Sequence, residues 1–370
     1  MTSDTVNKKK YNRIKLVLSL TGTIVGIAFI LGIVLSGFSL SLSRYIGTIT
    51  ENTYLQLILF VAAIGFVESM LTFPLNYYSG YRMEHQYGMS NQTFFQWMKE
   101  NMKATAVGTV IGLPLLLIFY FCLNIFQENW WLPVATVFFL FSVLLARIAP
   151  TLIFPLFYKF KPIENESLKN KLTRLCSGVN MTIAGIFEFN MSKTTKKANA
   201  AFAGIGRSKR IILADTLLNN FSEDEIEVVF AHEVGHYYHK HIVKSILLSI
   251  VTIFAGLYIA AYFYKQSLPV FSFTSITDIA ALPLLGLILM FFGFLTGPIN
   301  NTLSRAYERQ ADAYALNTTK NKHAFITAMQ RLSTMNLADE EPHPLVEFLF
   351  YSHPAISKRV RAAEAFNVQV

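Results

Sequence analysis

Long stretches without a charged side chain dominate the sequence and predict membrane-spanning helices. Four of them are wholly uncharged and occupy residues 16–43, 104–127, 246–264 and 279–303. Each is long enough to cross the ~30 Å hydrocarbon layer of a bilayer as a helix. Two further apolar stretches, 53–76 and 130–157, contain one charged residue each, Glu68 and Arg147. The pattern predicts a mainly α-helical polytopic membrane protein with six transmembrane helices, in which these two charges pair, line the bundle interior or snorkel to an interface.

These spans divide the chain into four regions. Residues 1–157 hold an amino-terminal tail and four spans, and residues 158–244 form a polar block. Residues 245–303 contain the last two spans, and residues 304–370 form a second polar block. We expect the two polar blocks to assemble together beneath the bundle.

Local signals in the first polar block predict a small β-structure followed by a helix. Three short runs are typical of strands in a small antiparallel hairpin or sheet: residues 184–189, 200–203 and 211–213. Ser222 and Glu225 then form a capping-box signature, with acidic residues between them that favour a helix amino terminus. Residues 223–241 should therefore be helical.

Composition and charge agree with a membrane protein. Hydrophobic residues make up 53% of the chain, charged residues only 15%, and the mean hydropathy is +0.39, whereas soluble domains carry about 25% charged residues. This balance disfavours a disordered chain and a soluble nucleic-acid-binding protein, so we expect no nucleic-acid partner. The net charge of +9 follows from basic residues in the tails and polar blocks, which places both termini and both blocks on the cytoplasmic side.

The predicted helix at 223–241 carries the sequence His232-Glu233-Val234-Gly235-His236. Histidines at positions i and i+4 project from one face of a helix about one turn apart, close enough to bind one Zn²⁺ ion. Glu233 lies beside them, where it can take a proton from a zinc-activated water. His239 and His241 follow and are expected to pack or to contact a ligand rather than to bind metal.

A third ligand is expected from the second polar block, where Glu308 and Asp312 are also spaced i and i+4. One carboxylate can bind the metal while the other orients a ligand histidine. Three protein ligands leave one tetrahedral position for water or substrate, which is the arrangement of a catalytic zinc site. A donor for the developing oxyanion is expected from His353, with Arg359 six residues later.

Several separated motifs together resemble the type I CAAX prenyl endopeptidases, which are integral-membrane zinc metalloproteases. They are HEVGHYYHKH, YERQADAYAL and YSHPAISKRV, preceded by KANAAFAGIGRSKRIILADTLL and by FPLNYYSGYRMEHQYGMSNQTFFQWMKE. The resemblance implies a helical bundle that encloses a chamber with the zinc site facing into it. It also implies removal of the last three residues from a prenylated Cys-aliphatic-aliphatic-X carboxy terminus, so the expected partners are the bilayer and a peptide or protein substrate that carries a lipid.

The same resemblance assigns roles to individual residues. It implies one zinc ion per chain, with the general base Glu233, the second carboxylate Asp312 and the ligands His232, His236 and Glu308. His353 and Arg359 would stabilise the transition state, and Asn199 with Ala200 would hold the substrate backbone. Members of the family have seven membrane helices, a number that this chain reaches only if the helix bearing His232 is counted. The short connector at residues 44–52 favours a bacterial inner membrane over the endoplasmic reticulum.

Two other functions fit the same residues. A membrane-protein quality-control metalloprotease would use the same zinc chemistry on damaged membrane proteins. A transporter or scaffold with a structural zinc ion would use the intramembrane charges Glu68 and Arg147 instead.

Overall fold

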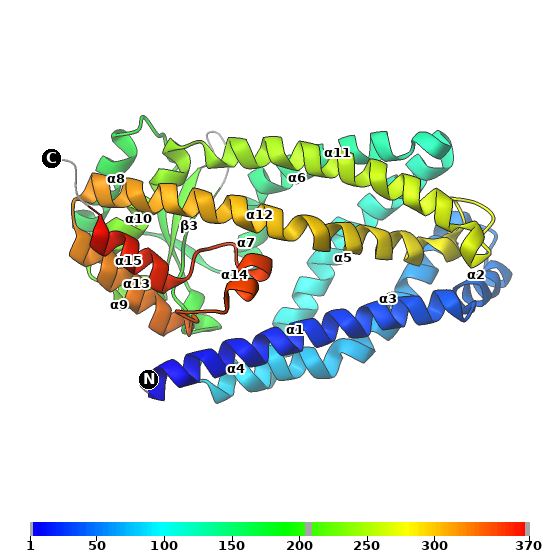
Figure 1. Cartoon of the computed structure of the whole chain (residues 1–370), viewed down its shortest axis with the longest axis horizontal. Helices are drawn as coiled ribbons and strands as arrows, with labels where there is room; N and C mark the ends of the chain where they lie inside the picture. Colours follow the sequence, from blue (N-terminus) through cyan, green and yellow to red (C-terminus); the bar gives the residue numbers. More distant parts are fainter. Residues whose placement is uncertain (1–2, 204–208, 367–370) are drawn as a thin grey trace.

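The computed structural model describes residues 3–203 and 209–366. The protein consists of an elongated bundle of helices and, at one end of it, a polar part that contains both helices and strands (Figure 1). Among these residues, six helices are long and apolar enough to cross a membrane, which confirms the predicted number. The helices that contain the candidate spans are α1 (Ser3–Leu35), α3 (Thr53–Tyr77), α5 (Phe94–Phe126), α6 (Trp131–Ile148), α11 (His241–Ser267) and α12 (Leu282–Thr319). The protein is therefore a polytopic, mainly α-helical membrane protein.

Short elements extend or connect these spans. A π-helical turn, η1 (Tyr78–Arg82), joins α3 to α4 (Met83–Gln86), and a second one, η3 (Ala149–Ile153), joins α6 to α7 (Phe154–Phe157). The connector after α1 forms α2 (Phe38–Ile49), whose 12 residues reach only about 18 Å and cannot cross a bilayer. The 3₁₀ turns are η2 (Gln127–Asn129), η4 (Met191–Lys193), η6 (Pro269–Phe271) and η7 (Ile279–Ala281).

The membrane helices converge at the end of the molecule that is farthest from the polar part. A buried cluster there joins the end of α1, the start of α3, the end of α5 and the α11–α12 hairpin, with Trp130 and Tyr264 among its largest members. Toward the polar part, α1 and α3 diverge from α11 and α12 (Figure 1). An enclosed chamber among these helices remains a prediction of the family resemblance.

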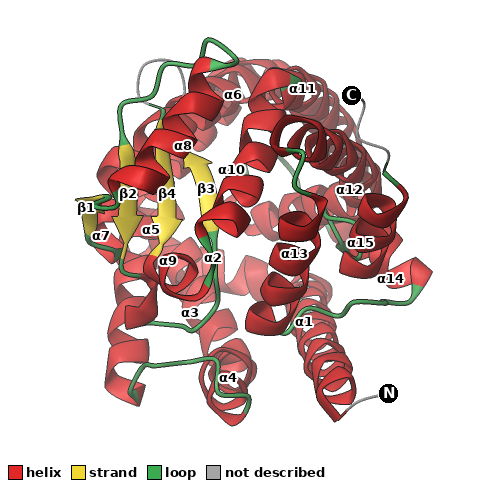
Figure 2. Cartoon of the chain, turned by 90° about the vertical axis from the view of Figure 1, so that its left-hand side faces the viewer, coloured by secondary structure: helices red, strands yellow, loops and turns green. Residues whose placement is uncertain are grey.

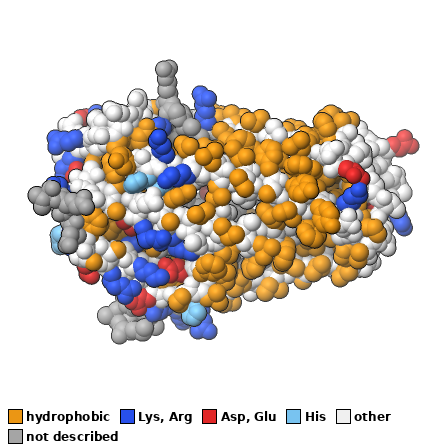
Figure 3. Space-filling view, turned by 45° about the horizontal axis from the view of Figure 1, so that its top comes forward, with side chains coloured by type: hydrophobic (Ala, Val, Ile, Leu, Met, Phe, Trp, Pro, Cys, Tyr) orange, Lys and Arg blue, Asp and Glu red, His pale blue; other side chains and the backbone are white. Residues whose placement is uncertain are grey.

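The surface shows the same division between bilayer and water. Hydrophobic side chains cover the bundle, while most Lys and Arg side chains in this view lie over the polar part (Figure 3). Glu68 and Arg147 are both exposed, and among the described residues no ion pair joins them. The suggestion that these two charges pair is therefore not supported.

The polar part contains a four-stranded sheet in the order β1-β2-β4-β3 (Figure 2). Its strands are β1 (Phe160–Pro162), β2 (Ile186–Phe189), β3 (Ala200–Ala203) and β4 (Arg210–Ala214). The three predicted strands are present, but the prediction of purely antiparallel pairing is wrong, because β2 and β4 run parallel. β1 was not predicted, since its three residues include Lys161 and Pro162 and show no apolar alternation.

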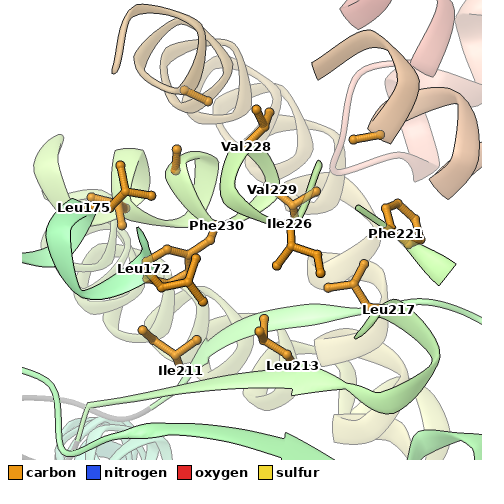
Figure 4. Close-up of a cluster of buried hydrophobic side chains, with 14 of the residues drawn as sticks. Leu172, Leu175, Ile211, Leu213, Leu217, Phe221, Ile226, Val228, Val229 and Phe230 are labelled. Carbon is orange, nitrogen blue, oxygen red and sulfur yellow. The ribbon is translucent and has the colours of Figure 1, made fainter. Parts of the chain in front are cut away.

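Helices cover the sheet and form the main core of the polar part (Figure 4). They are α8 (Glu166–Ser177), α9 (Asp215–Asn220) and α10 (Glu223–Tyr238). Leu172 and Leu175 of α8 pack with Ile211 of β4 and Phe230 of α10 in this core. Burial of these side chains holds α10 between the sheet and the remaining helices.

The predicted capping box is present at the start of α10. The Ser222 backbone N–H donates to Glu225 Oε2 at 2.8 Å, and the Glu225 N–H donates to Ser222 Oγ at 3.3 Å. The helix ends at Tyr238, three residues earlier than predicted, because Lys240 adopts a left-handed conformation with φ of 56° and α11 starts at His241. The helix that carries His232 is thus separate from the following span and is not itself among the six candidate spans.

The second polar block begins inside a membrane helix. α12 runs without a break for 38 residues, so the expected division at 303–304 lies inside one helix, as the division at 244–245 lies inside α11. After α12 come α13 (Lys322–Asn336), α14 (Pro344–Phe350) and α15 (Ile356–Ala365). A side chain on the distal part of α12 is therefore placed by the same helix that crosses the bilayer.

α10 and α12 touch backbone to backbone at Gly235. A Cβ atom at this position would lie 2.9 Å from the Cα and 3.1 Å from the carbonyl oxygen of Ala311, and 3.1 Å from Cβ of Tyr314. Two of these three atoms are backbone and cannot move aside as a flexible side chain would. Glycine at position 235 is thus required for the close approach of the two helices.

We predict that Gly235→Ala separates α10 from α12 and lowers stability by ~1–3 kcal/mol, as overpacked sites do. Thermal unfolding in detergent should show a lower Tm, and the metal content of the purified protein should fall. Gly112→Ala is the matched control, because a Cβ there meets nothing within 4 Å and alanine is the better helix former. Equal Tm values for the two variants would contradict the prediction.

Candidate metal centre

Two neighbouring helices supply the three predicted metal ligands. His232 and His236 project from α10, and Glu308 projects from α12, which packs alongside it. Their ligand atoms all lie within 4.8 Å of one another. The structure thus brings together the residues that the motif spacing selected, and they are able to hold one metal ion.

The distances fit a tetrahedral site. His232 Nε2 lies 3.1 Å from His236 Nε2 and 3.2 Å from Glu308 Oε2, and His236 Nε2 lies 3.3 Å from Glu308 Oε1. Tetrahedral metal–ligand bonds of about 2.0–2.1 Å place ligand atoms roughly 3.3 Å apart. Glu308 is only 4% exposed, and its Oε2 atom is buried with no hydrogen-bond partner. A cation between these three side chains would satisfy that oxygen.

Asp312 holds the first histidine from behind. Its Oδ1 atom lies 2.8 Å from His232 Nδ1, which leaves Nε2 of the ring directed at the metal position. Burial alone would lower the pKa of His232, but the adjacent carboxylates of Asp312 and Glu308 outweigh it and raise this pKa to about 9. Because only the neutral imidazole binds a metal, a proton competes with the metal ion at neutral pH.

Arg359 of α15 binds the same carboxylate, that of Asp312. Its Nε donates to Asp312 Oδ2 at 2.8 Å and its Nη2 donates to Oδ1 at 2.5 Å. Although burial opposes the charged form, Asp312 keeps the pKa of Arg359 above its usual value. The guanidinium lies behind His232, with Nη2 3.4 Å from His232 Nδ1.

A second chain of contacts holds the other histidine. His236 Nδ1 lies 3.0 Å from Nδ1 of His241, and His241 Nε2 lies 3.0 Å from Gln310 Oε1. A metal on His236 Nε2 requires Nδ1 of that ring to carry the proton and to donate it to His241. His241 then carries its own proton on Nε2 and donates to Gln310, so the amide oxygen selects the tautomer.

Gln310 had no sequence signal of its own, although it belongs to the motif around Glu308. The expectation for His241, a contact to a ligand rather than ligation, agrees with its place in this chain. His241 also stacks on Tyr307, with ring centroids 4.3 Å apart. His239 stacks on His241 at 5.5 Å.

His353 approaches the site from the loop between α14 and α15. Its Nε2 lies 3.3 Å from Glu308 Oε1, while its Nδ1 lies 2.9 Å from Ser352 Oγ. Arg305 secures the loop, because its guanidinium donates to the carbonyl oxygen of Tyr351 at 2.6 Å. His353 is therefore the sequence-predicted donor that stands beside the ligand atoms on the open side.

Two cavities meet at Glu233. One, of about 480 Å³, is lined by Asn199, Ala200, His232 and His353. The other, of about 460 Å³, lies among α6, α11 and α12 on the membrane side. Glu233 lines both of them, so its carboxylate is accessible beside the ligand pair.

The strand that borders the first cavity has a free edge. Within residues 3–203 and 209–366, β3 is the last strand of the sheet and pairs with β4 alone. The Asn199 carbonyl accepts from the backbone N–H of Ala214 in that strand. The Ala198 N–H instead donates to Asn336 Oδ1 at 3.0 Å, and the Ala198 carbonyl accepts from Asn336 Nδ2 at 3.2 Å. Because backbone groups alternate along an antiparallel strand, those of Ala200 face the same free edge as those of Ala198. Asn336 was not predicted, because no local pattern links it to the strand.

An HExxH helix, a carboxylate from a second helix and a free strand edge define a membrane-embedded metalloendopeptidase. The comparisons agree with that class. The chain belongs to peptidase family M48, whose family model matches residues 162–367. A second family model, described as "CAAX prenyl protease N-terminal, five membrane helices", matches residues 1–159. In that region the chain has four candidate spans and the short helix α2.

Individual relatives cover almost the whole chain. An uncharacterized metalloprotease of Bacillus subtilis (strain 168) is 31% identical over 96% of this chain and 84% of its own length. CAAX prenyl protease 1 of Saccharomyces cerevisiae is 30% identical over 85% of this chain and 73% of its own. The crystal structure of S. mikatae Ste24p matches with a TM-score of 0.87 and 27% identity, over 98% of this chain and 89% of that one. These findings support a metalloendopeptidase over a non-catalytic transporter or scaffold.

We predict that His241→Phe weakens metal binding by about 10–100-fold, as the loss of a partner behind a ligand histidine does elsewhere. Competition with a chromophoric chelator measures the affinity directly. His239→Phe is the matched control, since it removes the neighbouring imidazole but keeps the ring stack. An affinity unchanged in His241→Phe would show that the His236 ring does not need this contact.

Proposed function

We propose that the metal is zinc and that the enzyme cleaves near the carboxy terminus of prenylated CAAX-type peptides. The observation that carries the chemistry is the ligand set His232, His236 and Glu308 at tetrahedral separations beside Glu233. Two imidazoles and one carboxylate suit zinc, and the fourth position is left for water or substrate. Relatives in yeasts and plants that match most of this chain are named CAAX prenyl protease 1, which supports the substrate class.

The substrate is held in extended form along β3. Its backbone would pair with the free N–H and C=O of Ala200, while Asn199 borders the same cavity. Asn336 ends the available edge by occupying the backbone groups of Ala198. A peptide on this edge lies beside His232 and Glu233, which line the same cavity.

Zinc, when bound, polarises the scissile carbonyl and acidifies the attacking water. Glu233 accepts the proton of that water and delivers it to the leaving amine. His353 donates a hydrogen bond to the developing oxyanion from the open side of the site. We assign Arg359 a different role from the one that the resemblance implied: it positions Asp312 and through it His232, because its Nε and Nη2 both bind that carboxylate.

The second cavity supports a lipid-bearing substrate. It begins at Glu233 and extends between membrane helices α6, α11 and α12. A prenyl chain on the cysteine next to the scissile bond can therefore extend toward the bilayer while the peptide stays on β3. The basic tails and polar blocks favour an active site on the cytoplasmic face, and the short segment around α2 favours a bacterial inner membrane.

The different roles of His353 and Arg359 predict different kinetic effects. His353→Gln should keep zinc and the KM for peptide but lower kcat about 100-fold, because it loses a donor used in the transition state. Arg359→Met should lower zinc affinity, because Asp312 loses its counter-ion. Zinc titration and steady-state kinetics separate the two. Equal zinc affinity in Arg359→Met and wild type would contradict the positioning role.

Mass spectrometry of the products from three substrates tests the function. We expect cleavage of a farnesylated CAAX peptide before its last three residues, with far slower cleavage of the unprenylated peptide and of an unfolded membrane protein. Glu233→Gln should retain zinc and lose about 10²–10⁴-fold in rate, whereas Glu227→Gln, on the same helix, should behave as wild type. Preferential cleavage of the unfolded protein would favour a quality-control protease instead.

A further inference from the structure

α14 lies across α12 at the level where the uncharged part of that helix ends. Asn301 Nδ2 donates to the carbonyl oxygen of Leu349 at 2.8 Å, and Arg305 Nη1 donates to that of Glu347 at 2.9 Å. The charge-free stretch of α12 stops at residue 303, between these two anchors. α14 is therefore fixed at the boundary between hydrocarbon and headgroups, beside the middle of α12 (Figure 1).

The outward face of α14 is apolar. Leu345 is 57% exposed and Phe348 48%. Side chains of this kind at the bilayer boundary enter the interface, and a short helix that carries them lies in its plane. The face of α14 thus meets lipid rather than water.

A cavity of about 370 Å³ lies between α12, α14 and α15. Its walls include Arg305, Arg309, Lys358 and Arg359, against the two carboxylates of Asp312 and Glu347. It also has apolar walls, formed in part by Pro344 and Phe348 of α14. The lining is therefore amphipathic and carries an excess of positive charge.

Among the described residues, one of these positive charges, Arg309, has no carboxylate partner. Lys358 pairs with Glu347, and Arg359 pairs with Asp312. Arg305 is only 9% exposed and donates to two carbonyl oxygens and the Thr302 hydroxyl. Against the effect of burial, its charge helps to lower the pKa of the Glu347 carboxyl. Arg309 is exposed and forms no ion pair within the described ranges 3–203 and 209–366. The cavity thus carries four positive charges against two carboxylates, so an anion in it would be stabilised.

The depth of Arg309 suits a lipid phosphate. It lies one helical turn beyond Arg305, about 6 Å farther along the axis, and the headgroup layer of a bilayer is roughly 5–7 Å thick on each side. Arg309 thus lies in the headgroup layer, and the exposed ring of Phe348 lines the same cavity. A ligand that fits both features has an anionic head and apolar chains.

We propose that this cavity binds the headgroup of an anionic phospholipid. Its phosphate lies against Arg309 and Arg305, and its acyl chains pass over Phe348 and Leu345 into the bilayer. A free phosphate ion would use the basic residues but not the apolar face, so the membrane lipid is the occupant that uses both. Pro354 and Arg359 line this cavity and also the cleft beside His353, so the lipid would adjoin the active-site loop without entering it.

Native mass spectrometry of the full-length, zinc-loaded protein in a neutral detergent tests the proposal. Short-chain phosphatidylglycerol and phosphatidylcholine with identical chains are titrated separately, with inorganic phosphate as a third arm. We expect one phosphatidylglycerol to bind at least tenfold more tightly than phosphatidylcholine, and phosphate not to displace it. Arg309→Gln should weaken this binding about fivefold, the usual contribution of one basic residue near an anionic lipid.

Arg82→Gln is the matched control, because Arg82 is also an exposed arginine at the end of a membrane helix. Phe348→Ser is a second variant, which should weaken the binding of both lipids without changing the zinc content of the protein. Equal affinity for the two lipids would overturn the proposal, because it would show no recognition of the anionic head. Equal losses of phosphatidylglycerol affinity in Arg309→Gln and Arg82→Gln would overturn it in favour of general attraction to anionic membranes. Displacement by phosphate at the same concentration would overturn it in favour of a soluble anion.

Discussion

The close contact between α10 and α12 at Gly235 is the constraint on which the site depends. The ligand histidines and Glu308 belong to different helices, so their separations of 3.1 to 3.3 Å are set by how closely the helix axes approach. Without a Cβ at position 235, the backbone of α10 rests directly on that of Ala311. The four-residue spacing of His232 and His236 places two candidate ligands on one face of α10. The contact at Gly235 brings Glu308 of α12 close to them.

Buried charge is balanced around the same contact. Each candidate ligand histidine is held at its Nδ1 atom, His232 by Asp312 and His236 by His241, which leaves Nε2 free to bind a metal. The acceptors are themselves fixed, since Arg359 binds Asp312 through two donors and Gln310 binds His241. Such outer partners limit the rotation of the rings and select their tautomers. The open side, in contrast, is bordered by Glu233, His353 and the free edge of β3.

α12 links the bilayer to this chemistry. One continuous helix crosses the membrane, binds α14 through Asn301 and Arg305, and then presents Glu308 and Asp312 to α10. The loop that carries His353 is attached to the same helix by Arg305. One continuous helix therefore contains both a candidate membrane span and two residues of the candidate metal centre.

The sequence by itself determined the features that depend on residues close together in the chain. Long apolar runs with no charge or a single charge identified six spans, and the Ser222 capping box identified the start of α10. The motifs selected His232, Glu233, His236, Glu308 and Asp312. Only the tertiary structure decided the parallel pairing of β2 with β4, the strand β1, the bond of Asn336 to Ala198 and the attachment of Arg359 to Asp312. It also decided that the last span and the second polar block share one helix. Periodicity, capping and ligand spacing act over a few residues, whereas these contacts depend on which distant surfaces pack together, and no local pattern encodes that choice.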